Sequence, residues 1–396
     1  MFDELATQSA DYQAPQITPP AFNNRHQELE DVIAAVLDIQ QRNYNPIESV
    51  VAQYYGQLRL DSAQAFEIVD GRLQDMGYHA HFSVDEATNL HRIDVFRGRF
   101  SPPPRPVWPN VLLLILTILS TMSVGALLDD VPYENLFSLE VLKGWPYALS
   151  VMLILGAHEL GHYFAARHHQ VSVTLPYFLP FPPLLGFGFG TFGAFIQLRE
   201  PMRNRKQLFD VGVAGPLSGL IFAIPILIIG IATAEVNRLP TVEECREGGT
   251  CDYLLEGNSI VYAAAKYVIH GKWLPNDFED MTINQLSFAG WTGLFVTGLN
   301  LLPIGQLDGG HILYTLVGRT ARRLYIPAMI AMVILALNNS SWFLWVMLLF
   351  FFGRVYAVPM DDITPLDSRR RALGIFALAI FFLVFTPSPF EIISLR

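Results

Sequence analysis

Two histidines lie four residues apart in the segment His158-Glu159-Leu160-Gly161-His162. On a helix this spacing puts both imidazoles on one face, where they can hold a single zinc ion. Glu159 is then placed to act as general base on a water molecule that the metal activates. The motif follows an apolar run that resembles a membrane span, and ionisable groups at membrane depth are costly and usually functional. These residues predict an intramembrane metalloprotease.

A zinc site with two histidines needs one more protein ligand. The candidate is Asp308, which the two following glycines and the helix-breaking Pro303 allow to turn towards the metal. Asn300 has two interpretations: it stabilises the substrate carbonyl or tetrahedral intermediate, or it satisfies backbone groups that Pro303 leaves free. His311 either supports Asp308, or is a spare ligand, or is only a polar group facing the cavity.

These side chains must be positioned by apolar segments near the length of about 20 residues that crosses a bilayer. The segments are Val111–Leu128, Tyr147–Ala166, Phe209–Ala234, Leu286–Leu302, Leu324–Leu337, Trp342–Val358 and Ala372–Thr386. Of 396 residues, 52% are hydrophobic and 16% charged, against about a quarter charged in soluble domains. We expect a mostly α-helical, polytopic membrane protein of about seven transmembrane helices. The net charge of -10, with no basic stripe, excludes nucleic-acid binding.

Loop charges predict the orientation in the membrane. One set of loops is basic and is expected to be cytosolic, with Arg167, Arg199, Arg203, Arg205, Lys206, Arg319, Arg322, Arg323, Arg354, Arg369, Arg370 and Arg371. Seven spans then leave the N-terminus in the cytosol. The first residues resemble neither a signal peptide nor a transit peptide, which favours a bacterial cytoplasmic membrane. Cys245 and Cys251 share an outward loop, where a local disulfide can form.

The segments before the first span predict a separate soluble part. Residues 1–27 are polar and are expected to be disordered, and residues 28–100 are expected to form a cytosolic α+β domain. Helical spacing covers His26–Arg42, and alternating apolar and polar residues further on predict strands. Residues 101–106 form a Pro-rich linker. Residues 107–396 are expected to be the membrane metalloprotease domain, with its core at 147–310.

The stretch Leu175–Gln197 is too apolar for a solvated loop and too rich in proline and glycine for a helix. Such backbone is tolerated at membrane depth only where protein or a water-filled cavity covers it. One interpretation is a re-entrant loop ending in a strand whose edge binds an unwound substrate peptide. It makes Gly190, Gly193, Phe195 and Gln197 candidate substrate-binding residues. The other is an interfacial loop that only packs.

The chain resembles the site-2 proteases, the zinc-dependent intramembrane proteases. The resemblance rests on His-Glu-x-x-His at 158–162 and Asn-x-x-Pro-x-x-x-Leu-Asp-Gly at 300–309, and it is greatest to the thylakoid-type plant branch and its bacterial relatives. Three further stretches support it: 175–180, 190–197 and 210–219. It implies that His158, His162 and Asp308 bind zinc and that Glu159 is the catalytic base. It also implies a single-pass membrane protein as substrate.

Two other functions stay open at this point. Buried His, Glu and Asp side chains can also line a metal or proton pathway in a transporter, although no internal inverted repeat is found. A catalytically silent membrane chaperone is the second alternative, against which the intact Glu159 argues. The sequence gives no oligomeric state.

Overall fold

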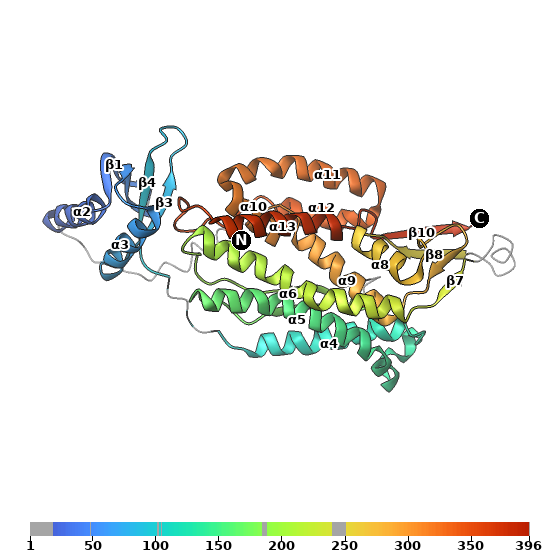
Figure 1. The fold of residues 1–396 in the computed structure, drawn as a ribbon. Helices are drawn as coiled ribbons and strands as arrows, with labels where there is room; N and C mark the ends of the chain where they lie inside the picture. Colours follow the sequence, from blue (N-terminus) through green and yellow to red (C-terminus); the bar gives the residue numbers. More distant parts are fainter. Residues whose placement is uncertain are drawn as a thin grey trace. The chain divides into compact units, whose positions relative to one another are not determined.

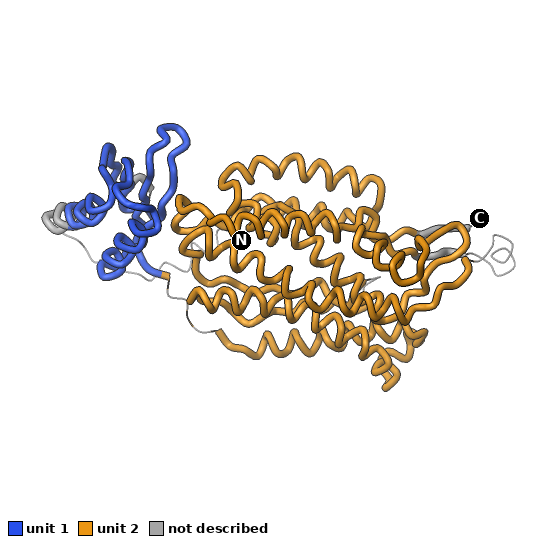
Figure 2. Tube along the Cα trace, viewed as in Figure 1, with its two compact units in different colours: residues 1–99 blue, residues 100–396 orange. Residues whose placement is uncertain are grey.

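The computed structural model describes residues 19–47, 49–100, 103, 105–183, 188–239 and 251–395. The chain divides into two compact units, residues 1–99 and residues 100–396 (Figure 2). Each unit is described by itself below, because their relative placement is not determined. The N-terminal unit contains a mixed helix and sheet fold, and the second unit contains the long apolar helices (Figure 1).

In its described residues the N-terminal unit is a four-stranded antiparallel sheet with two helices. Its elements are α2 (Pro19–Ala34), β1 (Leu37–Ile47), β2 (Val50–Leu58), α3 (Ser62–Asp75), β3 (Tyr78–Val84) and β4 (His91–Arg97). The strands lie in the order β1-β2-β4-β3. Apolar side chains from both helices and from one face of the sheet are buried together, among them Leu29, Phe66 and Phe82. This is the core that the alternating pattern predicts.

The first helix differs from the sequence prediction at both ends. It begins at Pro19, so residues 19–27, expected to be disordered, lie in α2, whereas residues 1–18 are outside the described residues. It ends at Ala34, so the helix expected over His26–Arg42 is wrong beyond that point. Strand β1 takes its place and pairs in antiparallel register with β2, from Leu37 opposite Leu58. Long-range strand pairing outweighs the local helical spacing here.

In its described part the second unit has nine α-helices, which Figure 1 shows as the long bundle and the elements at its end. They are α4 (Trp108–Leu127), α5 (Trp145–His168), α6 (Arg205–Ala232), α8 (Ile260–His270), α9 (Gln285–Asn300), α10 (Asp308–Val317), α11 (Tyr325–Asn338), α12 (Phe343–Phe352) and α13 (Ser368–Val384). Four described helical stretches are long and apolar enough to cross a membrane: Trp108–Leu127, Leu139–His168, Arg205–Ala232 and Asp308–Asn338. The other expected spans fall on α9, α12 and α13, which have 16, 10 and 17 residues.

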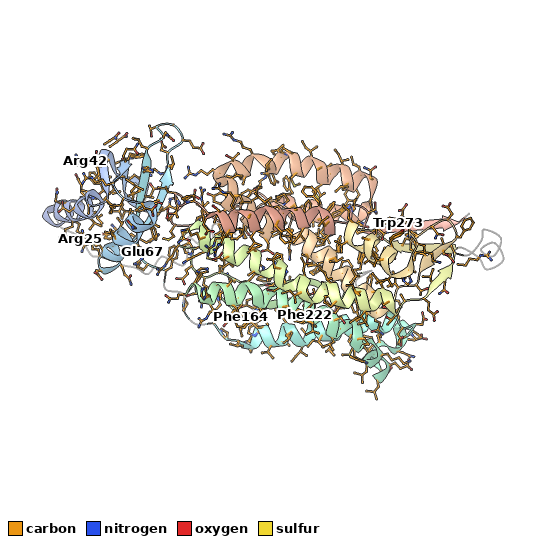
Figure 3. The ribbon with its side chains drawn as sticks, in the orientation of Figure 1. Arg25, Arg42, Glu67, Phe164, Phe222 and Trp273 are labelled. Atoms are coloured by element: carbon orange, nitrogen blue, oxygen red, sulfur yellow. The ribbon has the colours of Figure 1, made fainter. Side chains whose placement is uncertain are left out.

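Large apolar side chains point away from these helices. Phe164 on α5 is 63% exposed and Phe222 on α6 is 42% exposed (Figure 3). Exposed apolar surface of this extent is costly in water and is expected where a helix contacts lipid.

Helices α5, α6 and α9 pack closely because glycines lie at their contacts. A Cβ atom at Gly290 of α9 would lie 2.5 Å from the Cα atom of Leu227 on α6, and one at Gly161 of α5 would lie 2.7 Å from the carbonyl oxygen of Ala214. Small residues let helix backbones approach in this way. The three helices therefore form a tight core that holds the metal-binding motif.

A short antiparallel hairpin, β5 (Tyr177–Pro180) and β6 (Thr191–Phe195), packs against α4. The Asn110 side-chain amide donates to the carbonyl oxygens of Leu175 and Pro176, at 2.8 and 3.0 Å. The strand β6 lies near the end of the Leu175–Gln197 segment, where the sequence predicts a strand. Within that segment, residues 184–187 lie outside the described residues.

At the other end of the helices, four strands form two small sheets beside the helix α8 (Ile260–His270). The strand β7 (Val236–Arg238) pairs with β9 (Glu279–Met281), and β8 (Cys251–Glu256) pairs with β10 (Phe390–Leu395). We call these strands and α8 the outer cap. Cys245 and the side chain of Cys251 are outside the described residues, so the disulfide stays a prediction.

Candidate metal centre

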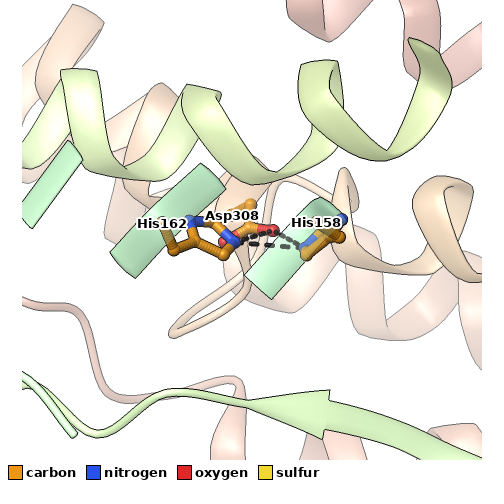
Figure 4. A group of neighbouring side chains, drawn as sticks. All are labelled: His158, His162 and Asp308. Atoms are coloured by element: carbon orange, nitrogen blue, oxygen red, sulfur yellow. Dashed lines mark hydrogen bonds and ion pairs between the residues drawn. The ribbon is translucent and has the colours of Figure 1, made fainter. Parts of the chain in front are cut away.

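Three ligand atoms from two helices converge at one point in the bundle (Figure 4). The Nε2 atoms of His158 and His162 on α5 are 3.1 Å apart. The Oδ2 atom of Asp308, the first residue of α10, lies 3.2 Å from the Nε2 atom of His158 and 3.3 Å from that of His162. The structure thus brings together the three residues that the sequence predicts as ligands.

These separations match the donor set of a zinc site. Four tetrahedral ligands at about 2.0–2.1 Å from a zinc ion are about 3.3–3.4 Å from one another. Among the described residues, these three side chains form the group of His, Cys, Asp or Glu that can hold a metal. They are 4%, 8% and 14% exposed. Their small exposure suits a site that keeps bulk water away from a metal.

The Asp-Gly-Gly sequence brings Asp308 into this position. Helix α9 ends at Asn300, and a turn leads directly into α10. A Cβ atom at Gly309 would lie 2.0 Å from the carbonyl oxygen of Leu301, and one at Gly310 would lie 2.4 Å from that of Gly305. Only glycine fits such backbone contacts. The turn can therefore fold back on itself and direct Asp308 towards α5.

Helix α6 fixes the orientation of His162, which sequence analysis did not predict. The Nδ1 atom of His162 is 2.7 Å from the carbonyl oxygen of Val211. This contact holds Nδ1 as the protonated nitrogen and leaves Nε2 to bind the metal. A Cβ atom at Gly215 would lie 2.0 Å from His162 Nε2. The Gly-x-x-x-Gly spacing of Gly215 and Gly219 is typical of a helix face that a neighbouring helix approaches closely, but it does not identify His162 as the contact.

Glu159 and Asn300 lie next to the three ligands. Glu159 is buried at 4% exposure, and it lines the same cavity as Ile196, just after β6. The side-chain nitrogen of Asn300, at the end of α9, is 3.2 Å from His158 Nε2. A carboxylate and an amide therefore flank the metal site from two sides.

Two cavities meet at Glu159 and Asn300. A cavity of about 290 Å³ contains the three ligands and His311, whose Nδ1 atom is buried without a hydrogen-bond partner. A larger cavity of about 650 Å³ extends from Glu159 towards the end of α11. Glu159 and Asn300 line both. A reacting group can therefore reach Glu159 from either cavity.

The four candidate substrate-binding residues separate into two pairs. Gly193 lines the larger cavity and Phe195 the smaller one. Gly190 faces α4 instead, where a Cβ atom would lie 2.7 Å from the Cα atom of Thr121. The side-chain oxygen of Gln197 accepts a hydrogen bond from the Arg105 guanidinium at 2.6 Å. Two of the four thus border the cavities, and two contact neighbouring protein.

The sequence is similar to known proteins over most of its length. Residues 146–338 match peptidase family M50. The chain is 31% identical over 283 residues, 70% of this chain and 48% of the relative, to "Probable zinc metalloprotease EGY2, chloroplastic" of Arabidopsis thaliana. It is 32% identical over 352 residues, 85% of this chain and 61% of the relative, to the protein of that name in Oryza sativa subsp. indica.

A third relative, "Probable zinc metalloprotease EGY1, chloroplastic" of Arabidopsis thaliana, is 26% identical over 316 residues, 72% of this chain and 54% of the relative. The chain spans about half to three fifths of the length of these curated relatives. The match includes α5 from its second residue, α6, α9 and α10, and hence all three side chains of the candidate metal centre. Residues 146–338 are a domain of peptidase family M50, the site-2 protease family that the two sequence motifs indicate.

Proposed function

We propose that this protein is an intramembrane zinc metalloprotease that hydrolyses a peptide bond within a transmembrane segment of another membrane protein. The observation that carries the proposal is the convergence of His158, His162 and Asp308 beside a buried Glu159, where two cavities meet. The M50 match and the zinc metalloprotease relatives support the same activity. They do not favour a transporter or a silent chaperone.

The proposed mechanism assigns a role to each side chain. When bound, zinc acts as a Lewis acid that polarises the peptide carbonyl and lowers the pKa of a water molecule. The Glu159 carboxylate takes the proton of the attacking water and delivers it to the leaving amine. The Asn300 amide donates to the oxygen on which negative charge develops. His162 keeps its orientation through the Val211 carbonyl.

We propose that the substrate is a single-pass transmembrane segment that unwinds locally. A helix hides its carbonyls in its own hydrogen bonds, so the segment must become extended before hydrolysis. In the described residues β6 pairs with β5 alone, which leaves its other edge for an added strand. Gly193 and Phe195 would contact that strand, whereas Gly190 and Gln197 would hold the hairpin in place.

We also propose that the chain has seven transmembrane helices. The shorter helices α9, α12 and α13 would cross the membrane together with the turns that flank them. The β5–β6 hairpin would be a re-entrant segment. The soluble domain at 28–100 and the linker at 101–106 would lie on the cytosolic side, before the membrane domain at 107–396. Support comes from the basic loops between α5 and α6, between α10 and α11, and before α13. The bacterial cytoplasmic membrane stays a prediction, since the curated relatives named above are chloroplastic.

The experiment is Glu159→Gln in the full chain, purified and reconstituted with a membrane-segment substrate. We expect zinc to stay bound at the stoichiometry of the unmutated protein while cleavage is lost, because the amide cannot accept the proton. Glu86→Gln, at an exposed loop position of the N-terminal unit, is the matched control and should keep full activity. Persistent cleavage by Glu159→Gln with zinc bound would exclude the proposed mechanism.

The role of Asn300 needs a separate variant. Asn300→Ala should lower kcat by about 10²–10³-fold, as for the loss of one donor to a developing oxyanion. Zinc content should not change, because Asn300 is not among the ligands. An unchanged kcat would assign Asn300 to backbone support of the turn at Pro303.

A further inference from the structure

The larger cavity differs in chemistry from the metal site that it adjoins. Aromatic rings from four separate parts of the chain form its walls: Phe181 and Phe189 beside the hairpin, Phe295 on α9, Trp345 on α12 and Phe390 on β10. Its polar lining residues are Glu159 and Asn300 beside the metal site, Thr191 on β6, and residues 338–341 with Glu391. The rest of its lining is apolar and rich in aromatic rings.

The rings pack against one another. Phe189 lies 5.6 Å from Phe295 and 5.8 Å from Phe390, between ring centroids. Phe295 is also 6.2 Å from Trp345. The Asn339 side chain donates to the Phe390 carbonyl oxygen at 2.7 Å and so fixes one wall. Such walls are formed before a ligand enters, as is usual for pockets of about 300–1,000 Å³.

Among the residues that the structure describes, the two cavities share three lining residues: Glu159, Ala194 and Asn300. Ala194 lies on β6, the strand proposed to pair with the substrate. A peptide bond held at Glu159 then has one flank in the small cavity of about 290 Å³ and the other in the aromatic cavity of about 650 Å³. The space for side chains is therefore unequal on the two sides of the bond.

We infer that the aromatic cavity is a specificity pocket for large apolar side chains on one flank of the scissile bond, the flank directed towards the end of α11. This rests on the proposed function and names the substrate class more narrowly. Aromatic side chains bury about 150–250 Å² each and gain further from ring contacts. Each methylene that a hydrophobic pocket accepts changes kcat/KM by about 10–200-fold. A substrate with Phe or Leu on this flank is preferred over one with Ala.

The first test uses the unmutated, zinc-loaded protein and one reconstituted membrane-segment substrate. Ala, Leu or Phe is placed in turn at each of the three positions on either side of the cleavage site, which mass spectrometry locates. We expect kcat/KM to rise about 100-fold from Ala to Phe at one or more positions of one flank, and to change little or fall on the other. Equal dependence on both flanks, or none, overturns the specificity pocket.

The second test fills the pocket. Val296 on α9 lines the aromatic cavity, so Val296→Phe should lower kcat/KM for the Phe substrate about 10-fold or more while the Ala substrate is cleaved nearly as before. Val333→Phe is the matched control, because Val333 on α11 is 41% exposed and lines neither cavity. An equal loss for both substrates, or the same shift in the control, overturns the inference.

Zinc content and thermal unfolding are measured for each variant, so a folding defect is recognised without an activity assay. A second filling variant, Leu299→Phe, on the same helix and also lining the cavity, replaces Val296→Phe if that protein does not fold. Failure of the proposed function gives a different result. The zinc-loaded unmutated protein would then cleave none of the substrates, whichever flank carries the Ala, Leu or Phe.

Discussion

The metal centre and a buried polar cluster in the outer cap, both in the second unit, are organised in opposite ways. At the metal centre, His158, His162 and Asp308 direct their ligand atoms at one point. In the outer cap, Glu256 and Lys266 are in contact with each other. The Tyr262 hydroxyl donates to Glu256 Oε1 at 2.8 Å, and the Lys266 Nζ atom is 3.6 Å from the same oxygen.

The charges of the second cluster face one another: the Lys266 ammonium lies near the buried carboxyl groups of Glu256 and Asp280. Lys266 has no exposed side-chain surface, and its Nζ atom lies 4.4 Å from the centre of the Tyr262 ring. Neither cavity described above is lined by Glu256, Tyr262 or Lys266. Burial of charge alone is therefore a poor guide to chemistry. A reactive site additionally needs empty volume and donor atoms that face it.

The largest effect is expected from a methyl group placed inside the metal centre. Gly215→Ala puts a Cβ atom 2.0 Å from His162 Nε2 in the present geometry, so the imidazole must move away. We expect zinc affinity and activity to fall by about 10–100-fold, as for loss of a ligand's support. Gly156→Ala is the control, because nothing lies within 4 Å of its Cβ position on α5. Normal zinc content in Gly215→Ala would show that the site is looser than its packing indicates.

The next effect concerns the outer cap. Lys266→Met leaves the Glu256 carboxylate buried without its cation, and breaking a buried pair costs roughly 3–5 kcal/mol. We expect lower thermal stability and faster amide hydrogen exchange in β8 and α8, with zinc content unchanged. The double variant Glu256→Gln with Lys266→Met should recover most of the loss. If Lys266→Met removes zinc, the two clusters are coupled and the contrast between them fails.

The smallest expected effect is a pH dependence of the stability that Lys266→Met loses. Burial raises the pKa of Glu256, and the Lys266 ammonium opposes this rise. A carboxyl whose pKa is higher in the folded state than in the unfolded state binds more protons when folded. Its contribution to the free energy of unfolding is therefore present at low pH and is lost as pH rises through the folded pKa. The stability deficit of Lys266→Met should therefore be larger at pH 8 than at pH 5. A deficit that is constant or grows on acidification would contradict this assignment.

The sequence predicts best what depends on local spacing. His158 and His162 are one helical turn apart, and Asp308 follows a proline and precedes two glycines, so residue types alone indicate a ligand set. Val211 and Gly215 could not be identified in this way, because their roles depend on how closely α6 approaches α5. Gly190 looked like part of the substrate strand, but its backbone lies against α4. Tertiary contacts decide these positions.

The helix predicted over His26–Arg42 fails for a similar reason. Its spacing suits a helix, yet Leu37–Ile47 pairs with β2. Propensity over a few residues is a weak guide when a strand partner is available. Each predicted apolar segment overlaps a helix. The largest difference in length is at Trp342–Val358, where the helix α12 has only 10 residues. The α9 helix stops at Asn300 because Pro303 and Gly305 follow it.

The ligands of the metal centre come from distant parts of the sequence, α5 and α10. Membrane proteins are synthesised from the N-terminus, so the ribosome finishes the histidine helix long before it reaches Asp308. Under the proposed function, a nascent chain that has inserted only its first spans has an incomplete ligand set and cannot hydrolyse a peptide bond. Cleavage of neighbouring proteins at the insertion site would then be postponed at least until Asp308 has been added.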